Sequence, residues 1–477
     1  MSRWFSNRPV TLSVCTMSIV ALCAIAAPTG AHAATGARAS SPMTLAEAVS
    51  RALERDPSVG ALAEEMRIAN SRARLARRDL LPSLTLGYSM MDSVRYAGPD
   101  TSSRRISLGV EQLVTSGGRR QAGHRIESIR ATAVAREHQE RIHAVTMATM
   151  DQIARVLIEE MASELFARAH EVARDQLRIA RAEFALGLVT RNDLTELELA
   201  VRAVELDAVE SRQSLAARRA AVRRALGLDP GVVPRFRARV DPDYRGTIDP
   251  ERVRQTDSRE RAVALVRATT QRDIAEQELR VARSAWFPSL QLGAEVHASG
   301  DQFPLSEPGL SLTGSIRFGA PLLPNDTRVT VGTTAQDERT RALSAAVHPG
   351  DGLNQLSSIA AARLALDQSR AVLTMTHQEI ADATSEAVDR VELLRARIDL
   401  LRGRLELQRE MGAIREVQIQ LGEITRIRAL EQDGETARTE VELLRTIAAL
   451  FAAELHLIQL AAPDHHPEWL MFLAEES

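Results

Sequence analysis

The sequence predicts a mainly helical protein that also contributes strands to a membrane β-barrel, built as two copies of one unit of two strands and a long helical hairpin. Two distant stretches, Ile68–Met90 and Ile274–Val296, are near copies of each other. In both, a charged helical run ends at a proline, and the residues after it alternate apolar and polar. Each half then has a long proline-free run interrupted by a glycine, Gly187 or Gly422. Membrane-type strands repeated beside helical hairpins indicate a channel.

Residues 1–33 have the composition of a secretory signal. Two arginines precede an apolar run, and Ala31-His32-Ala33 has small residues where a signal peptidase requires them. The mature chain is expected to begin near Ala34. Beyond this segment no apolar run is long enough for a membrane-spanning helix, so such an exported chain is either soluble in the periplasm or enters the outer membrane as strands.

Both cysteines, Cys15 and Cys23, lie within the predicted signal. The mature chain is therefore expected to contain no disulfide, no thiol catalyst and no thiolate metal site. Lipidation of Cys23 stays open as an alternative, although Leu22 is bulky where a small residue is favoured before a lipidated cysteine.

The first unit is expected over residues 34–250. After the charged helix, strict alternation of apolar and polar residues predicts strands at about 83–96 and 104–114. The proline-free run that follows is rich in Ala, Arg, Glu and Leu and predicts a helical hairpin over about 119–227, turned at Gly187.

The second unit is expected over residues 251–463. Its predicted elements are strands at about 289–298 and 310–319 and a helical hairpin at about 353–462. It is longer than the first unit, and the added residues are assigned to an insertion at about 320–352, which contains the loop-like segments PLLPND and HPGDG. Residues 464–477 are expected to form a C-terminal tail.

Four strands cannot close a barrel, because every edge amide in the hydrocarbon must be paired. Copies of the chain must then associate, and three copies would supply twelve strands. The long helices have small apolar side chains spread among arginine and glutamate, so a ring of coiled-coil-like helices would bury their apolar stripes. The alternative is a soluble periplasmic coiled-coil scaffold without a channel.

The remaining chemistry argues against other classes of function. A net charge of −3 gives no electrostatic case for nucleic acid. No nucleophile elbow, phosphate loop or zinc-helix motif occurs, so we expect neither enzymatic activity nor a cofactor. His465-His466 lies beside prolines near the C-terminus and lacks a third ligand at the usual spacing, so we interpret it as loop with no bound metal.

Several blocks of the sequence resemble the outer-membrane efflux proteins, the TolC-like outer membrane factor family. They are MTLAEAVSRALERDPSV at Met43–Val59, ARRDLLPSLTL at Ala76–Leu86, ARSAWFPSLQL at Ala282–Leu292, and the glycine turns LGLVTRNDL and LGEITR. The resemblance covers essentially the whole mature chain. The opening block and the duplicated proline block together are specific, whereas either one alone would be weak.

The resemblance implies a homotrimeric tunnel, with a twelve-stranded barrel in outer-membrane lipid continued by an α-helical barrel into the periplasm. It also implies a passive conduit in a tripartite efflux or export system, which receives solutes from an inner-membrane efflux pump and a periplasmic adaptor protein. Drug, metal-ion and protein export are not distinguished, because the pump selects the substrate.

The family's functional residues map onto the hairpin tips. The residues that match the adaptor-docking tips are Gly187, Leu188, Val189, Thr190, Asp193, Gly422 and Thr425. Apart from docking, such a glycine permits a tight turn and such a threonine caps a helix. At the periplasmic gate the family has two acidic residues, but here Arg428 replaces the first and Glu431 keeps the second. Arginine and glutamate from three copies could pair across the entrance, which puts cation selectivity in doubt.

Overall fold

The structure is a computed structural model of the chain. It describes residues 38–39, 42–93, 101–255, 262–318, 325–334, 339–347, 353–420, 425–461 and 473–475. The predicted signal 1–33 with Cys23, the tip residue Gly422 and the pair His465-His466 lie outside the described residues.

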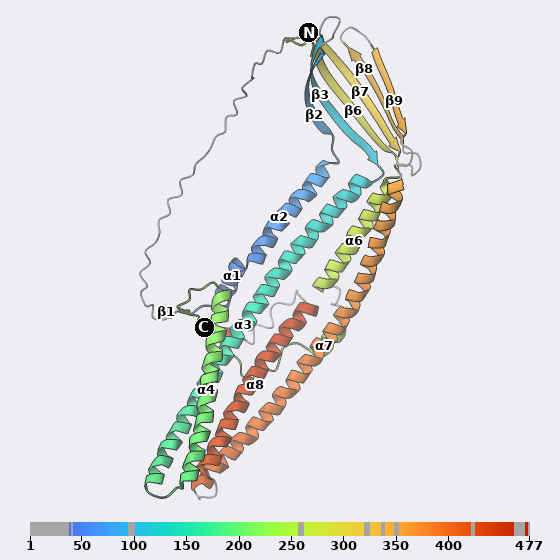
Figure 1. Cartoon of the computed structure of the whole chain (residues 1–477). Helices are drawn as coiled ribbons and strands as arrows, with labels where there is room; N and C mark the ends of the chain where they lie inside the picture. The colour runs from blue at the N-terminus through green and yellow to red at the C-terminus, as the bar shows by residue number, and fades with distance from the viewer. Residues whose placement is uncertain are drawn as a thin grey trace, which may run out of the picture.

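The molecule is long, with a sheet at one end and the ends of two pairs of long helices at the other (Figure 1). The first half contains α1 (Leu45–Arg55), α2 (Pro57–Arg78), β2 (Ser83–Ser93), β3 (Thr101–Ser116), α3 (Arg119–Ala185) and α4 (Arg191–Ala225). The second half contains α5 (Pro250–Gln255), α6 (Val263–Ser284), β6 (Ser289–Gly300), β7 (Glu307–Phe318), β8 (Asn325–Thr334), β9 (Arg339–Val347), α7 (Leu353–Gln420) and α8 (Arg426–Ala461). The predicted order of helix, strands and helical hairpin therefore occurs in both halves.

Short strands lie near the middle of the molecule. β1 (Arg38–Ala39) pairs in parallel with β4 (Val232–Val233), and β5 (Ala238–Val240) pairs antiparallel with β10 (Leu473–Glu475). The C-terminal residues expected to be only a tail thus include a strand. The sequence does not predict this strand, because three residues are too few to show an alternation of apolar and polar side chains.

All long strands form one antiparallel sheet in the order β2-β3-β6-β7-β8-β9. The expectation of four strands per chain was wrong, since the sheet has six. The two added strands occupy 325–334 and 339–347, inside the segment 320–352 that was expected to be a loop. The loop-like segments PLLPND and HPGDG flank this hairpin, and its alternation is weak because the strands contain few large apolar residues.

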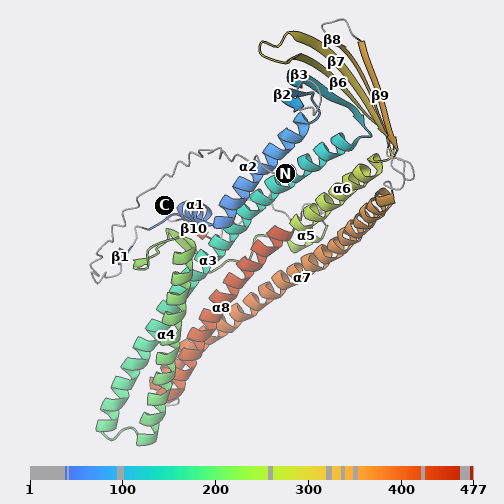
Figure 2. The same cartoon turned by 45° about the horizontal axis from the view of Figure 1, so that its top comes forward.

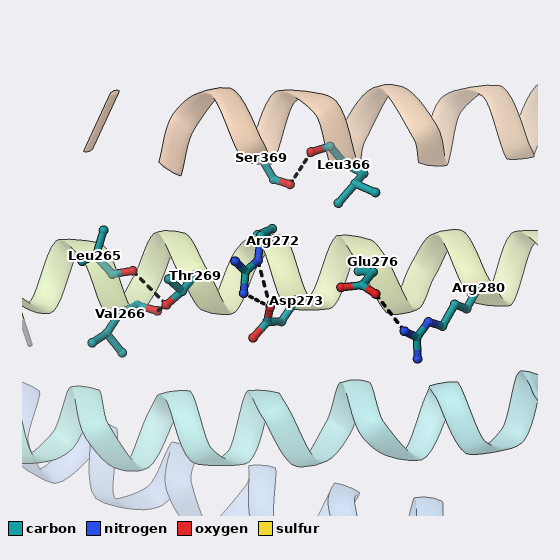
Figure 3. Close-up of polar contacts among 9 residues, drawn as sticks. All are labelled: Leu265, Val266, Thr269, Arg272, Asp273, Glu276, Arg280, Leu366 and Ser369. Carbon is teal, nitrogen blue, oxygen red and sulfur yellow. Dashed lines mark hydrogen bonds and ion pairs between the residues drawn. The ribbon is translucent and has the colours of Figure 1, made fainter. Parts of the chain in front are cut away.

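The helices pack along their lengths with polar side chains satisfied locally. α6 lies between α3 and α7, and Figure 3 shows its pairs Arg280–Glu276 at 2.8 Å and Arg272–Asp273. In the same view Ser369 of α7 donates to the Leu366 carbonyl at 2.7 Å. Hydroxyl groups that bond to their own helix leave the facing helix free to approach closely.

The main hydrophobic core lies near the middle, where α1, α3, α7 and α8 meet the linker between the halves. Capping residues fix where the first two helices begin. Thr44 and Glu47 form a capping box at α1, and Asp56 caps α2 with Pro57 in its first turn. Within the described residues, the helices lack any stretch apolar and long enough to span a membrane.

Candidate functional site: the tips of the helical hairpins

The turn of the first hairpin lies beside the end of α7 and the start of α8, at the end of the molecule opposite the sheet (Figure 1). The first residue of α8, Arg426, joins the two hairpins: its Nη2 lies 2.7 Å from Oε1 of Glu183, and its Nη1 donates to Gln176 at 3.3 Å. Both partners are on α3. The structure therefore brings the two predicted tips together within one chain.

The first tip is a tight turn that exposes apolar side chains. Gly187 has φ +76°, which a residue with a Cβ rarely adopts. Leu186 and Leu188 on either side of it are 75% and 72% exposed, and Val189 is half-buried. The chain thus presents two uncovered leucines at the extreme end of the hairpin.

A capping box ends this turn and starts α4. The Thr190 hydroxyl accepts from the Asp193 amide at 3.2 Å, and the Asp193 carboxylate accepts from the Thr190 amide at 3.3 Å. Both residues are among those that match the family tip. Their structural role is defined by these bonds, because capping holds the turn in one conformation.

The second tip is described from Thr425 onward. Thr425 is exposed, and its hydroxyl accepts from the Arg428 amide at 3.5 Å. Arg428 and Glu431 are both exposed on the first turns of α8. Residues at this separation share a helix face, so opposite charges stand side by side there.

Apolar packing between the two hairpins stabilises this arrangement. Leu430 of α8 is buried in a cluster with Leu197, Val201 and Val204 of α4 and with two alanines of α3. A salt bridge from Arg438 to Asp207 at 2.7 Å lies farther along the same contact. Sequence reasoning missed this contact, although the spacing of Leu197, Val201 and Val204 along α4 marks an apolar face.

A stripe on α7 is uncovered. Leu393, Leu400, Leu407 and Ile414 recur every seventh residue and are 68%, 75%, 62% and 60% exposed. Such a repeat is typical of a helix that packs against another helix in a coiled coil. Sequence reasoning proposed helix association in general and did not identify this stripe.

Matching apolar positions are exposed on the other hairpin. On α3, Val172 and Ile179 are also seven residues apart, and on α4 Leu199 and Leu206 are too. Leu199 and Leu206 are 67% and 57% exposed. One chain therefore carries uncovered heptad stripes on both of its hairpins.

A buried polar cluster holds the linker between the halves. The Glu454 carboxylate of α8 is 2% exposed and accepts from the Tyr244 hydroxyl, from the Thr247 amide at 3.3 Å and from Arg395 Nη2 at 2.9 Å. Burial, followed by the negative charge of Glu454, raises the pKa of Tyr244 well above its usual range. Gly246 is required here, because its φ is +88° and a Cβ would collide with Glu454. We call these residues the linker clasp.

The described residues contain no group of three histidine, cysteine, aspartate or glutamate side chains placed to hold a metal ion. The site is a surface of exposed leucines, capped turns and paired charges. Such a surface can bind another protein, and its charged residues can line an aqueous entrance.

Solved structures with the same fold are outer-membrane channels. The outer membrane protein VceC from Vibrio cholerae is 15% identical with a TM-score of 0.69, and the match covers 87% of this chain and 95% of that one. The MtrE outer membrane channel of Neisseria gonorrhoeae is 15% identical with a TM-score of 0.68, and the match covers 87% of this chain and 88% of that one. The CmeC outer membrane channel of Campylobacter jejuni is 13% identical with a TM-score of 0.66, and the match covers 87% of this chain and 85% of that one. At this identity the likeness establishes the fold.

A family model matches most of the first unit of the chain. Residues 48–228 match the model of the outer membrane efflux protein family. No curated protein matches the chain in sequence. The expected fold class, with strands and long helices in duplicated units, is confirmed, and the family match agrees with the expected family over residues 48–228.

Proposed function

We propose that this protein is the outer-membrane component of a tripartite export system, a homotrimeric passive conduit that receives solutes from a periplasmic adaptor and an inner-membrane pump. The single observation that carries the proposal is the uncovered heptad stripe on α7. Four large apolar residues on one helix face are costly in water, and matching stripes on α3 and α4 of another copy would cover them. Neither catalysis nor a cofactor belongs to this role.

The trimer is tested on the detergent-purified mature protein by native mass spectrometry and conductance in planar bilayers. The expected result is a three-chain particle that conducts. Leu400→Asp should reduce the fraction of trimer at least tenfold, whereas Leu400→Met, which keeps an apolar side chain of similar size, should not. A monomeric protein that is soluble without detergent would instead support a periplasmic helical scaffold.

The adaptor is proposed to dock at the exposed leucines of the first tip, Leu186 and Leu188. Leu188→Glu should abolish export of an efflux dye from the native host lacking its chromosomal copy, while trimer mass and bilayer conductance stay unchanged. Leu188→Met serves as the matched control. Unaltered dye export in the glutamate variant contradicts docking at this leucine.

The gate is proposed to be a ring in which Arg428 of one copy pairs with Glu431 of the next. Glu431→Ala should leave three unpaired arginines at the entrance and shift ion preference toward anions. Single-channel conductance in a salt gradient measures this preference. An unchanged reversal potential and open probability would remove Glu431 from the gate.

A further inference from the structure

The hairpin β8–β9 continues the sheet as an integral part of it. It pairs with β7 in regular antiparallel register from Gly309 opposite Thr334 to Phe318 opposite Asn325. β8 then pairs with β9 over nine positions without a register shift. Figure 2 shows the hairpin carrying the curved sheet on beyond β7, with β2 and β9 at the two edges.

The hairpin also continues the two faces of the sheet. Val329 and Val331 of β8 lie across from Gly314 and Leu312 of β7, on the face where the apolar residues of all the earlier strands lie. Leu343 of β9 lies across from Val329 on that face. These side chains are exposed in one chain, Leu343 by 72%. Lipid contact is the environment that such a broad apolar face requires.

The opposite face is polar through the same strands. Arg105 and Glu295 form an ion pair at 2.7 Å across β3 and β6, and Arg317 and Asp326 form another at 3.0 Å across β7 and β8. The second pair joins β8 of the added hairpin to β7. Charged pairs on one face and valine and leucine on the other are the division between lumen and lipid in a membrane barrel.

The apolar band crosses the sheet diagonally. Its centre lies between Leu86 and Tyr88 on β2 and near Ala345 on β9, and following the register it moves by roughly seven residues in five strand steps. That is about 1.4 residues, or about 4.6 Å, along the strand for each 4.8 Å across it, which corresponds to a strand tilt of about 45°. Membrane strands tilt by about 35–45°, so β8 and β9 follow the tilt of a horizontal lipid layer.

Arginines mark the outer boundary of this band. Arg104 on β3 and Arg341 on β9 both interrupt the apolar face at the end away from the helices. From β3 to β9 the position of the arginine moves along the strands by about the same number of residues per strand as the centre of the apolar band does. Arginine is favoured at the edge of the hydrocarbon layer, where its charge reaches the headgroups.

We infer that β8 and β9 are strands of the membrane barrel, and that β9 pairs with β2 of the next copy of this chain. Three six-stranded sheets then close an eighteen-stranded barrel. Since barrel diameter grows roughly linearly with strand number, this opening is about one and a half times as wide as that of a twelve-stranded barrel. The inference rests on the proposed trimer.

The occupant of the free edge is a second copy for two reasons. The edge amides of β9 lie within the apolar band, where they must be paired. β2 forms the opposite edge of the sheet and lies within the same apolar band. Its residues Leu86 and Tyr88 are at least 60% exposed. Extending the shift of the band across the junction sets Ser344 of β9 opposite Ser89 of β2.

Disulfide formation tests this junction, and the mature sequence suits it because both native cysteines lie at positions 15 and 23. The full chain carrying Ser89→Cys and Ser344→Cys is oxidised in outer membranes and run on a non-reducing gel. The expected result is a ladder of covalent dimers and trimers. Ala342→Cys and Ala346→Cys, each with Ser89→Cys, allow for a register slip of two residues, and a ladder from either supports the junction.

The matched control is Ser89→Cys with Thr313→Cys, which reports pairing of β2 with β7 of the next copy. In the proposed barrel Thr313 lies across from Thr330 of β8, so no ladder is expected. A ladder from this pair, or none from the three β9 pairs in protein that native mass spectrometry shows to be trimeric, overturns the eighteen-stranded barrel alone. A wild-type protein without trimers would overturn the proposed function itself.

Discussion

The two halves of this chain differ at the end that carries the sheet and agree at the end that carries the hairpin tips. In the first half two strands connect α2 to α3, whereas in the second half four strands connect α6 to α7. A hairpin returns the chain to the end of the sheet from which it left. The two additional strands therefore bring the chain back to the same end of the sheet, where a long helical hairpin follows as it does in the first half.

The largest effect is expected where the linker between the halves is held. Glu454→Ala leaves the buried Tyr244 hydroxyl without its acceptor and removes the ionic partner of the partly buried Arg395 guanidinium, which costs about 3 kcal/mol. Thermal unfolding of the purified protein measures this loss. Glu442→Ala, which removes the half-exposed partner of Arg397, is the control and should cost less than about 1 kcal/mol. Equal losses would contradict a special role for the linker clasp.

The next effect compares the added hairpin with the strands common to both halves. Leu343→Arg on β9 should destabilise the membrane-inserted protein by about 2–4 kcal/mol, as should Leu108→Arg on β3, because both place a charge in lipid. Folding into lipid vesicles under denaturant titration gives these values. Ser344→Arg, on the other face of β9, should have little effect. If Leu343→Arg were as mild, the hairpin would lie outside the membrane.

A smaller effect is expected at the hairpin tip. Thr190→Ala removes the capping box of α4 and should cost about 1 kcal/mol, while Thr190→Ser should restore the cap. Hydrogen exchange at the first turn of α4 reports local opening at this level. Equal protection in the alanine and serine variants would show that the cap does not hold the tip.

The smallest effect concerns pH at the start of α2. Burial raises the pKa of Asp56, but hydrogen bonds from Ser58, Arg141 and Val59 outweigh it and hold the pKa below its usual value. A lowered folded pKa means that the carboxylate stabilises the folded state above its unfolded pKa and loses this contribution as the pH falls through the folded pKa. The protection factor at the first turn of α2, which corrects for the pH dependence of intrinsic amide exchange, should fall below about pH 4 in wild type. Asp56→Asn should remove that dependence, and a persistent acid response would assign it to another group.

Local patterns in the sequence determined much of this fold. The proline after each charged helix, the alternation that follows it and the glycine in the first tip each act within a few residues, so the common strands and the hairpins could be predicted from them. The predicted tip residues Thr190 and Asp193 were found with their capping bonds for the same reason. The tips matched to adaptor docking, and the gate of Arg428 and Glu431, stay predictions.

Tertiary structure alone decided the rest. The hairpin β8–β9 has weak alternation, and its place is set by pairing with β7. Glu454 and Tyr244 are 210 residues apart, so their contact has no local signal. The apolar stripe on α7 could be counted in the sequence, but only packing shows that its own chain leaves it uncovered. Periodicity reports which face of an element is apolar, and long-range contacts determine what that face meets.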